Sequence, residues 1–290
     1  MVDGGDEMTT NSDAATNTAT KTYQYLRIAI VGVVAALAAA VLFEHAEVDC
    51  WQTSISAYYY TPVRAIFVGG LMAIGLCLIV IKGSGPWEDS FLNFAGMLAP
   101  IVAVVPTSTA GTCWSIEPNP RPVEPNGSLA PWVIANIDNN MKALIVVGIL
   151  GLVVAAALAL ATGDLQAALS GGEWGTRIGL IGSVVIVVGG WLAFAFWDDF
   201  YTKAHSIAAI TMFVFLAMVV AINAWKHWAA KDFLFWWYTA IAGLMVIVAA
   251  VILALKSDWD HAVLVLEAAE IALFAAFWIT QTVEHWEGAD

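Results

Sequence analysis

The sequence predicts an all-α protein, a polytopic bundle of about eight transmembrane helices. Of the 290 residues, 60% are hydrophobic and only 12% are charged, about half the share typical of soluble domains. The mean hydropathy is +0.78. A helix needs about 20 mostly apolar residues to cross a hydrocarbon core, and eight stretches approach or reach that length. A net charge of −13 with few Lys and Arg excludes a nucleic-acid-binding protein.

The predicted spans follow one another with short connections. In order they are Leu26 to Phe43, Pro62 to Ile81, Phe91 to Pro106, Lys142 to Ala161, Arg177 to Trp197, His205 to Trp225, Phe235 to Leu255 and His261 to Gln281. They define a bundle over residues 21–284, with short tails at 1–20 and 285–290.

The first span follows a polar leader that is rich in Thr, Asp, Asn and Ala. Residues 1–20 have no periodic apolar face, which predicts a disordered tail. The sequence after the span, Glu44-His45-Ala46-Glu47, lacks the small-residue pattern of a cleavage site. We therefore expect an uncleaved anchor.

The third and fourth spans differ most from the others. The third contains Asn93, Pro100 and Pro106 around a short apolar run, so a re-entrant segment and a total of seven spans is the alternative. The fourth has no polar side chain between residues 143 and 161, which predicts a lipid-facing position. The loop between them, 107–141, is the longest and is expected to form a stiff, Pro-rich cap.

Orientation is weakly indicated by Lys and Arg, which are almost evenly divided between the two sides. The cysteines are more informative, because Cys50 and Cys113 fall in loops on the same face. Two such cysteines predict a disulfide and an extracytoplasmic location for that face. The alternative is that Cys50 and Cys113 are two unpaired thiols. We expect a protein of the cytoplasmic membrane with both termini inside.

The last span carries the clearest candidates for function, because ionisable groups inside a span are costly. Glu267 and Glu270 share one helix face, about 9 and 14 Å below its outer end. A carboxylate at that depth either pairs with a cation or stays protonated. Arg64 and His205 enter their spans from the same face and are the expected partners.

This outer-face cluster supports several hypotheses. The leading one is a protein without catalytic activity or cofactor that binds or transports a small polar or lipidic ligand. Arg64 would neutralise an anionic group or a glutamate, Glu270 would carry an exchangeable proton, and His205 with Glu267 would connect that proton to the surface. A non-catalytic structural clasp between helices is the second hypothesis.

The third hypothesis is a metal-dependent intramembrane hydrolase that acts on lipids. Zinc is predicted only under this alternative. Its ligands would come from segments that share the outer face, namely His45, Asp198, Asp199, His205 and His261. The spacing evidence is weak, because the chain has no two His four residues apart on a helix and no Cys/His set with ligand spacing. No Gly-x-Ser-x-Gly turn accompanies Ser54 or Ser56.

One stretch carries a family pattern: a Ser-x-Ser-x-Tyr-Tyr-x-Thr sequence before a span, an Arg near its start and a Phe-Val-Gly step. The residues are Ser54, Ser56, Tyr58, Tyr59, Thr61, Arg64 and Phe67-Val68-Gly69. The chain here resembles a family of uncharacterised bacterial multi-pass integral membrane proteins, a domain of unknown function. The resemblance continues more weakly at His205 and Glu270. It implies a membrane location and no particular activity.

The chain departs from this family pattern at one position. The family pattern favours an acidic residue after the Arg, whereas this chain has Ala65, so an ion pair at that point is not implied. A more distant similarity is to the alkaline ceramidases and adiponectin-type receptors, whose zinc site uses a Ser, an Asp and three His. The expected partners are therefore the lipid bilayer and a small ligand, and the sequence indicates no oligomeric state.

Overall fold

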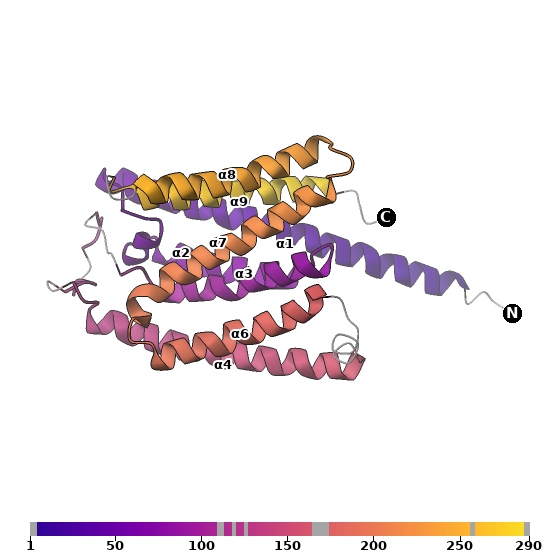
Figure 1. Ribbon diagram of the computed structural model, residues 1–290, viewed down its shortest axis with the longest axis horizontal. Coiled ribbons are helices and arrows are strands. Elements are labelled where there is room, and N and C mark those ends of the chain that lie inside the picture. The colour runs from indigo at the N-terminus through magenta and orange to yellow at the C-terminus, as the bar shows by residue number, and fades with distance from the viewer. Residues whose placement is uncertain are drawn as a thin grey trace.

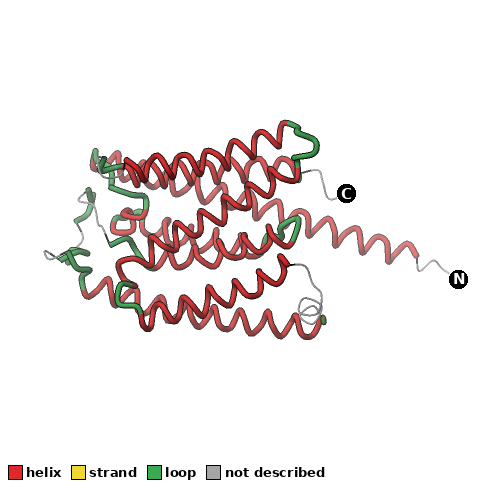
Figure 2. The backbone as a smooth tube through the Cα atoms, viewed as in Figure 1, coloured by secondary structure: helices red, strands yellow, loops and turns green. Residues whose placement is uncertain are grey.

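The chain folds into a bundle of long helices (Figures 1 and 2). The computed structural model describes residues 5–108, 113–117, 120–124, 127–163, 174–255 and 259–286, and their side chains from residue 20 onward. Within these ranges there is no strand, which confirms the predicted all-α polytopic bundle. The elements are α1 (Gly5–Val48), the 3-10 helix η1 (Ser56–Tyr60), α2 (Arg64–Val80), α3 (Pro86–Val104), α4 (Pro131–Thr162), α6 (Trp174–Phe196), α7 (Phe200–Lys226), α8 (Phe233–Leu255) and α9 (Ala262–Glu284).

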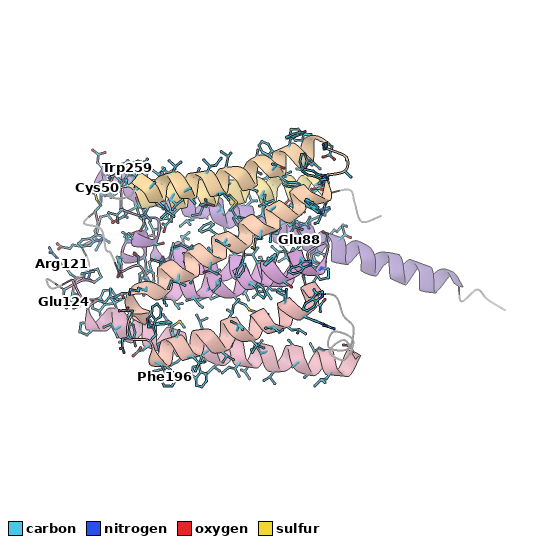
Figure 3. The ribbon with its side chains drawn as sticks, viewed as in Figure 1. Cys50, Glu88, Arg121, Glu124, Phe196 and Trp259 are labelled. Atoms are coloured by element: carbon cyan, nitrogen blue, oxygen red, sulfur yellow. A yellow bond between two sulfur atoms is a disulfide. The ribbon has the colours of Figure 1, made fainter. Side chains whose placement is uncertain are left out.

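Successive long helices run in opposite directions, so the bundle has two distinct ends (Figure 1). Figure 3 shows Cys50 and Trp259 at one end and Glu88 at the other. We call these the Cys50 end and the Glu88 end. Helices α1 and α9 pack against each other. The first residues of α1 and the last residues of α9 both lie on the Glu88 side of the bundle.

The composition of the helices is that of a membrane-embedded protein. Six of them, all but α2 and α3, are long and apolar enough to cross a membrane. The most apolar windows of α4 and α6 contain no buried residue. In α4 this agrees with the lipid-facing position predicted for the fourth span, because lipid surroundings allow the exposed surface of a helix to be entirely apolar.

Helix α3 lies at the centre of the bundle and packs against α2, α6, α7 and α4. Its 19 residues extend about 28 Å. Leu92, Ala95, Ala99 and Ala103 are at most 1% exposed. The span that looked weakest in sequence is therefore a continuous helix surrounded by protein, and its lower apolar content reflects contact with other helices instead of lipid.

Close packing around α3 depends on small residues. A Cβ on Gly96 would lie 2.6 Å from the carbonyl oxygen of Gly75 in α2, and a Cβ on Gly182 in α6 would lie 2.2 Å from the Phe94 ring. Both distances are far below van der Waals contact. Glycine at these positions lets the helices approach as small residues do in membrane bundles.

Two predicted boundaries are wrong. Helix α1 begins at Gly5, so residues 5–20, expected as a disordered tail, continue the helix of the first span beyond the bundle (Figure 1). After Gly5 the segment contains no Pro or Gly, and a helix already nucleated propagates easily. Helix α4 begins at Pro131, so the loop predicted at 107–141 is shorter. Proline is favoured in the first turn of a helix, where its missing N–H has no partner to lose.

Candidate functional site

The segment that leads into η1 is fastened to the start of α9. The carbonyl of Thr53 accepts a hydrogen bond from the backbone N–H of Leu264 at 3.0 Å. The Nδ1 atom of His261 lies 3.2 Å from the carbonyl of Gln52. The first contact pairs the N–H of Leu264, one of the N–H groups that the first turn of a helix leaves without an intrahelical partner.

The same segment is tied to the loop after α3. Cys50 and Cys113 form a disulfide, with their Cα atoms 5.8 Å apart. Beside it, the buried carboxylate of Glu44 in α1 accepts hydrogen bonds from the backbone N–H and the hydroxyl of Ser115, both at 2.9 Å. The loop therefore holds η1 in place, and all five η1 residues are buried.

Ser56, the first residue of η1, joins two helices that are far apart in sequence. Its backbone N–H donates to Oε2 of Glu267 in α9 at 3.0 Å, and its Oγ lies 3.0 Å from Oε1 of the same carboxylate. The Oγ also lies 2.8 Å from Nε2 of His205 in α7. On the other side of the ring, Nδ1 of His205 lies 2.6 Å from the carbonyl oxygen of Val105.

Glu267, Ser56 and His205 form a chain of hydrogen bonds, which we call the Ser56 chain. The positions of its hydrogens follow from which atoms can donate and which can accept. A carbonyl can only accept, so Nδ1 of His205 carries a hydrogen. The two contacts of the Ser56 Oγ each need one hydrogen, and the hydroxyl supplies one. The second lies either on the Glu267 carboxyl or on Nε2 of His205. A shift of both hydrogens interconverts the two arrangements, so the chain can pass a proton between Glu267 and His205.

Glu270 lies one turn further along α9, on the face that carries Glu267. As a whole residue it is 5% exposed. Within the described part of the chain it has no hydrogen bond or ion pair. It lies about 12 Å along α9 from Ala262. Burial of a carboxylate without a partner favours its protonated form, so Glu270 is suited to gain and release a proton.

The predicted cluster is therefore only partly assembled. His205 and Glu267 meet through Ser56. Arg64 does not join them, because its guanidinium lies 4.3 Å above the ring of Tyr59 and donates to the hydroxyl of that residue at 2.7 Å. Its position at the first residue of α2 turns it toward a separate pocket, described below. The expected ion pair between Arg64 and a glutamate is absent from the described residues.

The predicted metal set is not assembled either, since no group of His, Cys, Asp and Glu in the described ranges could hold a metal ion. His45 stacks on Trp51, with ring centroids 3.8 Å apart, and Asp199 pairs with Lys203. His205 and His261 have the partners given above. Each His is therefore occupied locally, and Asp198 adds no shared site.

The Ser56 and His205 pair also resembles a nucleophile beside a base, at a suitable distance. Ser56 is only 5% exposed, however, and it lines neither the pocket beside Arg64 nor the groove beside Trp225 and Trp228. Its hydroxyl is also held by Glu267. The arrangement is suited to proton transfer within the protein more than to attack on a substrate.

A second polar cluster, at the Glu88 end, was not predicted from sequence. Glu88 accepts hydrogen bonds from the N–H and hydroxyl of Ser84 at 2.9 and 2.8 Å, from Nδ2 of Asn223 at 2.8 Å and from Nζ of Lys226 at 2.6 Å. Oδ1 of Asn223 accepts from Nε2 of Gln281 at 2.7 Å. These residues connect α3, α7 and α9. Polar residues near the ends of three spans on the same predicted side were the available signal.

The same end holds a group of contacts around His227. Its two ring nitrogens lie 2.9 Å from Oδ2 of Asp232 and 3.1 Å from Oε1 of Glu284. Tyr238 donates to the other oxygen of Glu284. Asp232 also accepts from the backbone N–H of Phe235 at 2.9 Å, and this bond, together with His227, holds the pKa of Asp232 below its ordinary value.

Comparison with known proteins gives no matching family, no matching curated protein and no matching solved structure.

Proposed function

We propose that this protein takes up a proton at its Cys50 end and couples it to the binding or transport of a small polar or lipidic ligand. The observation that carries the proposal is the double contact of the Ser56 hydroxyl with Glu267 and His205. The Ser56 chain, made of Glu267, Ser56 and His205, would relay the proton between the surface of the Cys50 end and Glu270.

The surroundings of Glu270 favour coupling over continuous proton conduction. Further along the same face of α9, Phe274 and Trp278 are 5% and 2% exposed. These side chains fill the interior between Glu270 and the Glu88 cluster. Because a proton needs polar groups or water to move, release toward the Glu88 end would require a rearrangement of the helices. A protein that carries a ligand can supply such a rearrangement.

The proposal includes an orientation. The Cys50–Cys113 disulfide favours an extracytoplasmic location for the Cys50 end, since disulfides persist on the oxidising side of a membrane. Both termini would then be cytoplasmic, in the cytoplasmic membrane. The proton would enter from outside.

The test uses the full-length protein in liposomes adsorbed on a solid-supported membrane. A rapid pH jump should produce a transient current in the wild-type protein, because a charge enters the membrane region. Glu270→Gln should abolish the current, and Ser56→Ala should slow it by about a hundredfold or more, the loss typical of removing a proton-transfer group. Glu117→Gln is the matched control, since that carboxylate is exposed and pairs with Arg121 in the loop.

A current that is unchanged in both Glu270→Gln and Ser56→Ala would refute the proposal. The clasp hypothesis gives a different pattern. Under it, Ser56→Ala lowers the melting temperature in detergent, and no variant changes the response to a pH jump.

A further inference from the structure

An open pocket of about 480 Å³ lies at the Cys50 end, apart from the Ser56 chain. Its walls come from η1 and the start of α2, from the last turn of α3 and from α4. Its polar lining side chains are Arg64, Asn140 and the hydroxyls of Tyr59 and Thr61, of which Thr61 already donates to the carbonyl of Tyr58. The remaining wall is apolar and includes Val68 and Val104. The volume is in the range of ordinary small-molecule sites.

The charge of this pocket is uncompensated. Arg64 is its one charged lining residue, and its contacts in the described structure are the ring and hydroxyl of Tyr59. A guanidinium has five N–H donors, of which this hydrogen bond uses one. Burial raises the pKa of Tyr59, against the opposing effect of Arg64, so the phenol stays neutral and does not balance the charge. The pocket therefore favours an anion.

The depth of the pocket matches that of a lipid headgroup. Helix α2 is apolar from Ala65 onward, so Arg64 marks the point where the chain enters the hydrocarbon region. Below it, Ala65 and Gly69 are exposed, and Leu76 on the same face is 65% exposed. A Cβ on Gly69 would meet nothing within 4 Å. An acyl chain can lie along this face while its phosphate reaches Arg64.

We propose that this pocket binds the phosphate headgroup of an anionic membrane phospholipid. Arg64 would donate to the phosphate oxygens in the paired geometry that suits a guanidinium, and the Asn140 amide would bind the polar groups beside it. The apolar walls favour a lipid over a free anion, because a hydrated ion gains nothing from contact with Ala65, Val68 and Val104. The site is independent of proton uptake at Ser56.

The test is native mass spectrometry of the full-length protein released from mild detergent. The protein is titrated with phosphatidylglycerol, with phosphatidylcholine of the same acyl chains, and with inorganic phosphate. We expect phosphatidylglycerol to bind more tightly than phosphatidylcholine. Arg64→Gln should weaken phosphatidylglycerol binding by about tenfold or more, the effect expected for losing charge-assisted hydrogen bonds.

Two further variants complete the design. Arg177→Gln is the control, because Arg177 lies 5.5 Å above the Trp174 ring near the start of α6, at the Glu88 end, and should not change binding. Val68→Trp fills the pocket and leaves Arg64 in place, so it should displace the lipid even if Arg64→Gln fails to fold.

Three results would overturn the inference. Phosphatidylcholine could bind as tightly as phosphatidylglycerol, which would remove the role of charge. The lipid could bind equally well to Arg64→Gln and Val68→Trp, which would place it elsewhere. Inorganic phosphate could bind alone and displace the lipid, which would identify a site for a free anion.

Discussion

Replacing Lys226 with Met should destabilise the protein by about 3 kcal/mol. The variant leaves Glu88, whose side chain is 6% exposed, without a counter-ion. Removing one partner of a buried ion pair typically costs about 3–5 kcal/mol. We take the lower limit for two reasons. Lys226 is 35% exposed, so water already screens the pair, and Glu88 keeps the hydrogen bonds from Ser84 and Asn223.

The assay is thermal unfolding in detergent, followed by tryptophan fluorescence. A loss of about 3 kcal/mol corresponds to a melting temperature about 6–12 °C lower in a protein of this size. Lys82→Met is the matched control, because the pair of Lys82 with Asp89 is more exposed and should contribute about 1 kcal/mol or less. Adding Glu88→Gln to Lys226→Met should restore part of the loss. Equal melting temperatures for Lys226→Met and Lys82→Met would refute the reasoning.

Two other predictions concern packing and pH. Gly96→Ala should destabilise the protein by about 1–3 kcal/mol, because the added Cβ meets the backbone of α2. Gly189→Ala has open space around it and should stabilise the protein slightly. Chemical denaturation of both variants in detergent tests whether the two changes in stability have opposite signs. The lowered pKa of Asp232, caused by the N–H of Phe235 and by His227, means that its stabilising effect is present above the unfolded pKa of about 3.9 and is lost as pH falls through the folded value. The melting temperatures of wild type and Asp232→Asn should therefore converge in acid and separate near neutral pH.

Apolar periodicity and length predicted the helices well where the helices face lipid. The fourth span is an example, since an uninterrupted apolar run in α4 is explained by its exposure alone. The same rule undervalued α3, because a helix surrounded by protein can hold Asn93, Pro100 and small residues that would be unfavourable in lipid. Neighbouring helices decide what such a span tolerates, and a single sequence does not show the neighbours.

The candidate site was predicted in part for a similar reason. Depth along a span identified Glu267 and Glu270, and a shared face identified His205. Sequence could not show that η1 places Ser56 between Glu267 and His205, since this depends on a short buried helix fastened by loop contacts. It also could not show that Arg64 packs on Tyr59, five residues earlier, instead of reaching α9.

From sequence, a proton-binding site and a structural clasp were alternative hypotheses for the outer-face cluster. The two ends of the bundle each carry a buried glutamate, and the surroundings of these glutamates differ. As whole residues, Glu88 and Glu270 are equally buried, each 5% exposed. Glu88 accepts four hydrogen bonds, one from a lysine, and this arrangement is the one expected of a clasp that holds α3 and α7 together. Glu270 has no such partner among the described residues. A buried carboxylate without a polar partner is more readily explained by proton exchange than by stability, which is the reason to look for a functional site at the Cys50 end.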